Sequence, residues 1–134
     1  MKLVLDTNIY ISSFFWNGSP RAIMSRIIEG QDMLFTSEKI LAETASVLTR
    51  PKFKVTQQAV EHLINSIREI AILVPYLGII KGVCRDSDDD KILECSLLGK
   101  ADYIVTGDDD LLALKTFQGI NIITAGEYLK HLLF

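Results

Sequence analysis

The sequence has few of the features that mark specialised classes of protein. Only two of its 134 residues are cysteines, Cys84 and Cys95, and their spacing fits neither a disulfide framework nor a zinc site. No apolar stretch approaches the roughly 18 residues that a membrane-spanning helix needs. Asp6 and Asn8 interrupt the apolar start of the chain, and no small-residue cleavage site follows, which argues against a signal peptide. We therefore expect a soluble, cytoplasmic protein with no membrane association.

Basic residues are also in the minority. There are 14 lysines and arginines against 17 acidic residues, a net charge of −3, which argues against a protein that coats nucleic acid nonspecifically. We find no internal repeat, low-complexity tract or linker. The length, with 49% hydrophobic and 23% charged residues, is that of about one ordinary globular domain. We therefore expect residues 1–134 to form a single domain.

Short apolar runs alternate with helical patterns along the chain. We predict strands over 2–6, 33–36, 71–74, 102–106 and 120–124, and helices near 19–30, 37–49, 56–70, 89–98 and 125–133. Ser19 and Thr56 are expected to cap two of these helices. The first strand is expected to run into a polar turn that carries Phe14, Phe15 and Trp16, and residues 76–88 to form an irregular connection. This alternation predicts an α/β fold with a mainly parallel central sheet of about five strands, flanked by helices.

What the sequence does have is an uneven distribution of acids. Nine of the 17 fall within 25 residues: Asp86, Asp88, Asp89, Asp90, Glu94, Asp102, Asp108, Asp109 and Asp110. Ligands of open α/β sheets bind beyond the carboxyl ends of the strands. Asp6 and Asp108 each follow a predicted strand and so fit such a site. A solvated turn residue is the competing interpretation of either one.

Helical periodicity assigns a face to Glu43. On the predicted helix 37–49, Glu43 lies at the shoulder of the apolar stripe, beside Ile40 and Val47. The side chain is therefore expected to face solvent only in part. A boundary glutamate near Arg50 is an equally good interpretation of this pattern.

The same periodicity separates Asp89 from its acidic neighbours. Counting along the predicted helix 89–98 from Asp89 reaches the inward positions Ile92, Leu93 and Ser96, so Asp89 heads the buried face. We interpret the other acids as helix caps or solvated charges, namely Asp86, Asp88, Asp90, Glu94, Asp102 and Asp109. Clustered carboxylates repel one another, and hard divalent cations such as Mg²⁺ or Mn²⁺ offset that repulsion.

Four segments carry a resemblance to a known family. They read LVLDTN, ILAETASVLTRPKF, CRDSDDDKILECSLLGKADYIVTGDDDLL and NIITAGEYL. In these segments the whole chain resembles the PIN-domain ribonucleases, especially the VapC-like toxins of bacterial and archaeal toxin–antitoxin systems. The third segment is the most specific, because an acid-rich turn, a helix, a strand and TGD follow in the family's order. The resemblance implies a three-layer PIN-like fold.

The resemblance also implies a site and a reaction. The implied metal-binding and catalytic acids are Asp6, Glu43, Asp89 and Asp108, with Asp90 and Asp110 as alternatives for the last two places. Thr7, Asn8 and Thr106 match positions that orient the carboxylates, although Asn8 could equally be a turn residue. The implied activity is hydrolysis of RNA phosphodiester bonds with Mg²⁺ or Mn²⁺. The implied partners are an RNA substrate, an antitoxin protein and a second copy of the chain in a homodimer.

Basic and aromatic residues near these acids are candidates for RNA contact. Phe53 stands between two lysines in the segment Arg50–Lys54, a pattern that binds phosphate and stacks bases, although a solvated loop fits equally well. Arg85 and Lys91 flank the acidic run and are expected to act similarly. Phe14–Trp16 is expected to pack in the core, with a partner contact as the alternative. The two histidines, His62 and His131, are expected to lie in helices away from the acids.

Two further functions compete with the nuclease. One is a PIN-like RNA- or protein-binding module with little or no turnover, which would show no carboxylate-dependent metal binding. The other is an aspartate-phosphorylating phosphatase, which fits less well because LVLDTN has no second acid two residues after Asp6.

Overall fold

One sheet organises the fold in the computed structural model, which describes residues 1–132. Within these residues the sheet has six strands: β1 (Lys2–Leu5), β2 (Met33–Thr36), β3 (Ala71–Leu73), β4 (Tyr103–Val105), β5 (Thr116–Phe117) and β6 (Ile120–Ile123). Their order is β3-β2-β1-β4-β6-β5, and every pairing is parallel except that of β5 with β6. The predicted α/β class is confirmed, and the short edge strand β5 is an addition to the five strands predicted.

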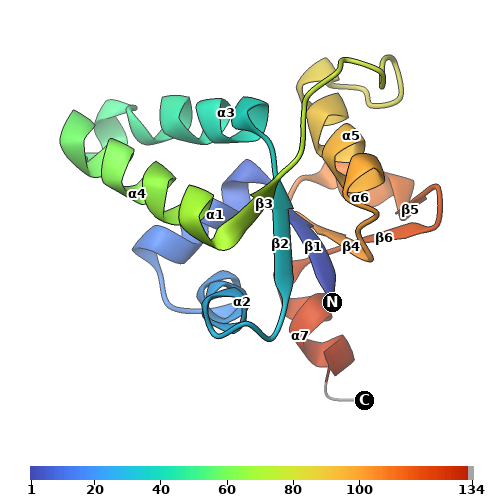
Figure 1. Cartoon of the computed structure of the whole chain (residues 1–134), viewed down its shortest axis with the longest axis horizontal. Helices are drawn as coiled ribbons and strands as arrows, with labels where there is room; N and C mark the ends of the chain where they lie inside the picture. The colour runs from blue at the N-terminus through green and yellow to red at the C-terminus, as the bar shows by residue number, and fades with distance from the viewer. Residues whose placement is uncertain (133–134) are drawn as a thin grey trace.

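Helices flank the sheet. They are α1 (Thr7–Phe15), α2 (Ser19–Ile28), α3 (Glu38–Leu48), α4 (Gln57–Ile70), α5 (Asp90–Leu98), α6 (Asp109–Leu114) and α7 (Ala125–Leu132), with short 3₁₀ turns η1 (Pro51–Phe53) and η2 (Ser87–Asp89). Figure 1 shows α3 and α4 lying together on one side of β2 and β3, with α5 and α6 toward the other side of the molecule. The five predicted helices are confirmed within two residues; the predicted end at residue 133 lies outside the described residues.

Helix α1 corrects the prediction of a polar turn after the first strand. The chain passes directly from β1 into this helix, because Asp6 caps it: its side chain accepts a hydrogen bond from the Thr7 N–H at 2.8 Å. The segment TNIYISSFF is rich in β-branched and aromatic residues, which are poor helix formers. Its helix is held by packing, since Ile9, Tyr10 and Ile11 are buried. The six-residue helix α6 was also not predicted.

The starts of two predicted helices turn out differently. Thr56 caps α4 as predicted, since its hydroxyl accepts a hydrogen bond from the Ala59 N–H at 3.1 Å. Ser19 does not cap α2. The cap is Gly18, which has a φ of +148° and no side chain to accept a bond, and Ser19 is the first helical residue.

The topology brings two loop segments together at one end of the sheet. From central β1 the chain builds β2 and β3 on one side and then β4 and β6 on the other, so the strand order reverses between β1 and β4. Leu5 is in register with Val105, and the Asp6 N–H donates to the Val105 carbonyl at 3.0 Å. Residues that follow these two buried strands therefore emerge side by side, where ligands of open α/β sheets bind.

Two other expectations concern less regular parts. Residues 74–86 contain no helix or strand, as expected of an irregular connection. Cys84 and Cys95 are both free thiols. No helix within residues 1–132 combines the length and the apolar character that crossing a bilayer requires.

Candidate functional site

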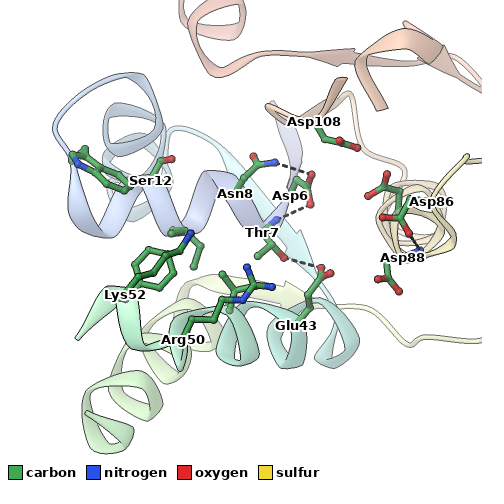
Figure 2. Close-up of a pocket in the computed structure, with 15 residues that line it drawn as sticks. Asp6, Thr7, Asn8, Ser12, Glu43, Arg50, Lys52, Asp86, Asp88 and Asp108 are labelled. Atoms are coloured by element: carbon green, nitrogen blue, oxygen red, sulfur yellow. Dashed lines mark hydrogen bonds between the residues drawn. The ribbon is translucent and has the colours of Figure 1, made fainter. Parts of the chain in front are cut away.

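An open pocket of about 670 Å³ lies at the carboxyl ends of β1 and β4. Its acidic lining consists of Asp6, Glu43, Asp86, Asp88, Asp89 and Asp108 (Figure 2). All four predicted site acids are in this set, and they come from four places: the end of β1, the middle of α3, the residue before α5 and the loop after β4. The alternatives Asp90 and Asp110 do not line the pocket.

Asp6 is the most firmly held of these carboxylates. It is 6% exposed. Its Oδ2 accepts hydrogen bonds from the Thr106 hydroxyl at 2.7 Å and from the Asn8 amide at 3.2 Å. Burial raises the pKa of Asp6, the bonds from Thr106 and Thr7 oppose that rise, and the charges of Glu43 and Asp108 add to it. The orientation of the carboxylate is thus fixed, and its buried negative charge is destabilising without a positive partner.

Thr106 and Asn8 connect the end of β1 to the loop after β4. The Thr106 hydroxyl also accepts a hydrogen bond from the Asp108 N–H at 2.9 Å, and Asn8 Oδ1 accepts one from the Gly107 N–H at 3.1 Å. Asp108 in turn caps α6 by accepting from the Leu111 N–H at 3.3 Å. Both polar residues therefore lie where they orient two of the acids, and Asn8 is part of α1 rather than of a turn.

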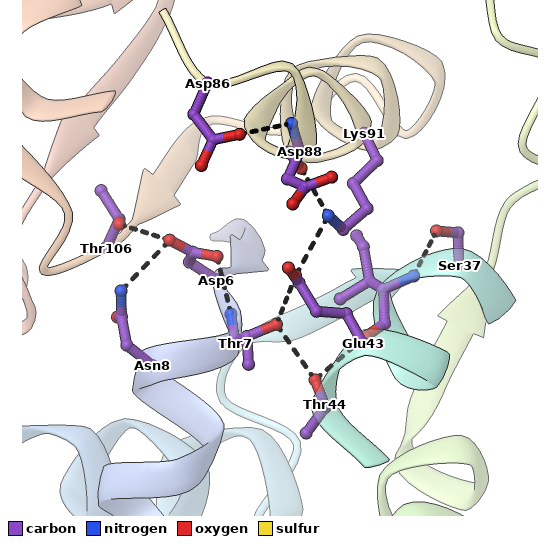
Figure 3. Close-up of polar contacts among 11 residues, drawn as sticks. Asp6, Thr7, Asn8, Ser37, Glu43, Thr44, Asp86, Asp88, Lys91 and Thr106 are labelled. Atoms are coloured by element: carbon purple, nitrogen blue, oxygen red, sulfur yellow. Dashed lines mark hydrogen bonds and ion pairs between the residues drawn. The ribbon is translucent and has the colours of Figure 1, made fainter. Parts of the chain in front are cut away.

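Glu43 is held from two sides, as Figure 3 shows. Its Oε2 accepts a hydrogen bond from the Thr7 hydroxyl at 3.0 Å and lies 3.1 Å from Lys91 Nζ. The ionic partner of Glu43 is thus Lys91 and not Arg50. The predicted RNA contact by Lys91 is wrong, because this side chain is 7% exposed and is engaged with Glu43.

Asp89 occupies a half-buried position beside other acids. Burial, and then the neighbouring Asp108 carboxyl, raise the pKa of Asp89 to about 8, with further contributions from the charges of Asp6 and Asp86. The inward positions counted from Asp89 are indeed fully buried. Such a pKa is typical of a carboxylate set assembled for a positive ligand, because like charges brought together favour protonation.

Asp86 and Asp88 join the pocket in a way the helical pattern did not predict. Asp86 caps η2 as expected, accepting from the Asp88 N–H at 3.0 Å, and both side chains are exposed. They also line the pocket, because η2 turns them toward Asp6 and Glu43 (Figure 2).

Two acids interpreted as solvated are structural. Asp90 is 7% exposed and accepts hydrogen bonds from the Gly82 and Cys84 N–H groups at 3.2 and 3.1 Å. Glu94 is 1% exposed and accepts from the Leu77 and Ile79 N–H groups at 2.6 and 2.7 Å. The solvated interpretation is wrong for both, because they satisfy the backbone of the irregular connection. The sequence pattern does not mark these contacts, because their partners lie in a segment without helix or strand, 6 to 17 residues earlier in the chain.

The opposite wall of the pocket is basic and aromatic. Arg50, Lys52, Phe53 and Trp16 line it. Phe53 stacks on Phe15, with ring centroids 5.2 Å apart and planes at 14°, and Lys52 Nζ lies 5.1 Å from the centre of the Phe53 ring.

Other basic and aromatic candidates behave differently from these four. Phe14 and Phe15 pack against the core as expected, whereas Trp16 is 58% exposed. Lys54 and Arg85 are exposed but do not line the pocket. The histidines are exposed on α4 and α7, outside the pocket, as predicted.

The donor chemistry of the pocket fits a hard divalent cation. Its acidic lining offers carboxylate oxygens, the ligand type that Mg²⁺ and Mn²⁺ prefer, and includes neither histidine nor cysteine. Within residues 1–132, no three acidic, histidine or cysteine side chains are close enough to form a ready-made ion site. Mg²⁺ commonly binds through one or two carboxylates and keeps several waters, so the arrangement suits that mode.

Comparison with known proteins gives three findings. A family model described as PIN domain matches residues 2–110. The uncharacterized protein MJ1680 of Methanocaldococcus jannaschii is 33% identical over 124 residues, which cover 86% of this chain and 76% of that protein. A chain in the crystal structure of VapBC2 from Rickettsia felis, bound to a DNA fragment from its promoter, superposes with a TM-score of 0.62 and 14% identity. That match covers 91% of this chain and 97% of the other, and it shows a shared fold.

Proposed function

The chain belongs to the PIN domain family, and on that premise we propose that it is a metal-dependent endoribonuclease, the toxin of a toxin–antitoxin pair. In this proposal residues 1–134 act as one PIN-like domain. The observation that carries it is the convergence of acids from four separate elements on one pocket whose opposite wall is basic and aromatic. A metal-dependent enzyme that cuts a polyanion needs both a site for cations and a surface that holds phosphate.

We assign the cation to Asp6, Glu43, Asp89 and Asp108. When bound, Mg²⁺ or Mn²⁺ lowers the pKa of a water molecule and stabilises negative charge on the phosphate. The protein's own contribution is to fix the carboxylate oxygens through Thr7, Asn8 and Thr106, and no side-chain nucleophile is required.

The basic and aromatic wall is proposed to hold a single strand of RNA. Arg50 and Lys52 are exposed beside the acids and can neutralise backbone phosphates. Trp16 presents an exposed indole, braced by Phe15 at a ring distance of 5.9 Å, on which an unpaired base can stack. Stacking of this kind contributes about 1–3 kcal/mol per base and tolerates any sequence. A paired base offers no free face, so the wall favours unpaired segments.

Cleavage of a fluorescently labelled single-stranded RNA tests the proposal. We expect cleavage with Mg²⁺ or Mn²⁺, none after chelation with EDTA, and a loss of roughly 100-fold or more in Asp6→Asn and Asp89→Asn. Asp109→Asn is the matched control, because this exposed aspartate adjoins Asp108 but does not line the pocket. Cleavage that survives EDTA would refute the metal mechanism. RNA binding without cleavage or metal binding would instead support the binding module.

The toxin role is proposed from the fold that this chain shares with a chain of the VapBC2 structure. A partner surface is available, because several large apolar side chains are exposed on the β3 edge and just after it: Ile72, Leu73, Tyr76, Leu77 and Ile79. We expect induced expression of the chain alone to arrest bacterial growth and Asp6→Asn to relieve the arrest. Equal growth of both strains at equal protein levels would contradict the toxin role. Light scattering on the purified chain tests the proposed homodimer.

A further inference from the structure

Lys91 is a buried lysine within an acidic neighbourhood. It lies in the first turn of α5, is 7% exposed and donates a hydrogen bond to the Asp88 carbonyl. Its ammonium group is 3.1 Å from Glu43 Oε2, and Figure 3 shows the side chain reaching across from α5 to α3. Lysines are rarely this buried unless they are paired. The pair therefore places a fixed positive charge next to one of the proposed metal ligands.

The contacts of Glu43 leave it only one available oxygen. Oε2 is taken by the Thr7 hydroxyl and by Lys91. The Thr7 hydroxyl is itself packed 3.2 Å from that of Thr44 on α3. Among residues 1–132, Glu43 Oε1 has no hydrogen-bond or ion-pair partner.

The aspartate side of the pocket has no such positive charge. Asp6 receives hydrogen bonds only from neutral groups, the Thr7 N–H, the Thr106 hydroxyl and the Asn8 amide. Within the described part of the chain, none of Asp6, Asp89 and Asp108 has a basic side chain within ion-pairing distance. Among the described residues, the carboxylates of the pocket therefore have a fixed cationic partner at Glu43 and none at the three aspartates.

From this asymmetry, and resting on the proposed nuclease function, we propose that Lys91 takes the place of a second divalent cation. The site then holds one Mg²⁺ or Mn²⁺ on the side of Asp6, Asp89 and Asp108, bound directly by one or two of these carboxylates and through waters to the rest, and Glu43 offers it a single oxygen. Two-metal nucleases instead place a second ion about 3.5–4 Å from the first. Lys91 is in this sense a positioning residue: it fixes Glu43 and supplies charge without touching the substrate.

The test counts bound Mn²⁺ per chain by calorimetry and by the electron paramagnetic resonance signal of free Mn²⁺. We expect one ion for the wild-type chain and two for Lys91→Met, because the lost ammonium frees Glu43 Oε2 for a second ion. Lys91→Arg keeps the charge and should bind one. Lys39→Met is the matched control: it removes an exposed lysine on α3, near Glu43, and should also bind one.

The outcomes separate this inference from the function on which it rests. Two ions in the wild-type chain, or one ion or none in a folded Lys91→Met, would overturn the role of Lys91 and leave a metal nuclease possible. No ion in the wild-type chain would overturn the proposed function itself. If Lys91→Met does not fold, the double variant Lys91→Met, Glu43→Gln removes both charges together. It should bind one ion, and none would contradict a site on the aspartate side.

Discussion

Replacing Thr106 by valine tests how the site is held together. This residue is fully buried, and its hydroxyl makes two hydrogen bonds within the site. It donates to Asp6 Oδ2 at 2.7 Å and accepts from the Asp108 N–H at 2.9 Å. Valine has nearly the same shape, so the substitution removes these bonds without creating a cavity. The protein should therefore fold, with a lower free energy of unfolding and with Asp6 and Asp108 less firmly oriented.

The expected loss follows from the two bonds. A buried hydrogen bond to a charged group contributes about 1.5–3 kcal/mol, and leaving the partly buried Asp108 N–H without its partner costs an amount at the lower end of about 1–3 kcal/mol. Allowing for partial relaxation, we expect the free energy of unfolding of Thr106→Val to fall by about 3 kcal/mol, or a melting temperature lower by roughly 10 °C. Loss of a residue that orients metal ligands typically lowers the metal affinity about 10- to 100-fold, so Mn²⁺ binding should weaken by about that factor.

Urea unfolding at pH 7 in EDTA measures the first quantity, and Mn²⁺ calorimetry the second. Thr36→Val is the matched control. Thr36 is also fully buried, but its hydroxyl contacts no carboxylate of the site; its polar neighbour is the neutral Tyr10, outside the pocket. Its replacement should change the free energy of unfolding by about 1 kcal/mol or less and leave Mn²⁺ affinity unchanged. Equal effects of the two substitutions on stability, or unchanged Mn²⁺ affinity in Thr106→Val, would refute the role assigned to Thr106.

Three further predictions concern other parts of the site and its support. Burial raises the pKa of Glu94, but its backbone N–H donors outweigh this effect and lower the pKa overall, so its contribution to stability is present above pH 4.5 and is lost on acidification. In urea titrations, Glu94→Gln should lower the free energy of unfolding at pH 7 by about 2 kcal/mol and should lose less stability on acidification than the wild-type chain. Because the pKa of Asp89 is raised, the metal-free native state loses stability as the pH rises from the ordinary pKa of an aspartate to about 8. Mn²⁺ should therefore raise the melting temperature more at pH 8.5 than at pH 5.5, and Asp89→Asn should abolish that difference. Trp16→Ala should weaken single-stranded RNA binding roughly 5- to 100-fold in fluorescence anisotropy while Mn²⁺ affinity stays unchanged; equal RNA affinity would exclude stacking on this residue.

The sheet was predictable because its strands are short β-branched runs with helical patterns between them. Helix α1 was not, since its local propensity opposes helix formation and its stability comes from burial of Ile9, Tyr10 and Ile11 against distant segments. Helix α6 has only six residues and begins with two acids, so its sequence reads as a continued acidic turn.

The acids show the same division between local and distant causes. Periodicity separated Asp89 from the rest, and the structure places it in the pocket with Asp6, Glu43 and Asp108. It failed for Asp90, because the 3₁₀ turn η2 precedes α5 and because the partners of Asp90 are backbone N–H groups of the irregular connection. Charge alone could not distinguish an acid that satisfies backbone from one that lines a pocket.

We propose above all that the pocket carboxylates hold a divalent cation. Anomalous diffraction at the manganese edge, from crystals soaked in Mn²⁺, tests it most directly. We expect one strong peak in the pocket, within about 2.5 Å of carboxylate oxygens of Asp6 and Asp89. A peak outside the pocket, or none at an Mn²⁺ concentration that supports RNA cleavage, would contradict it.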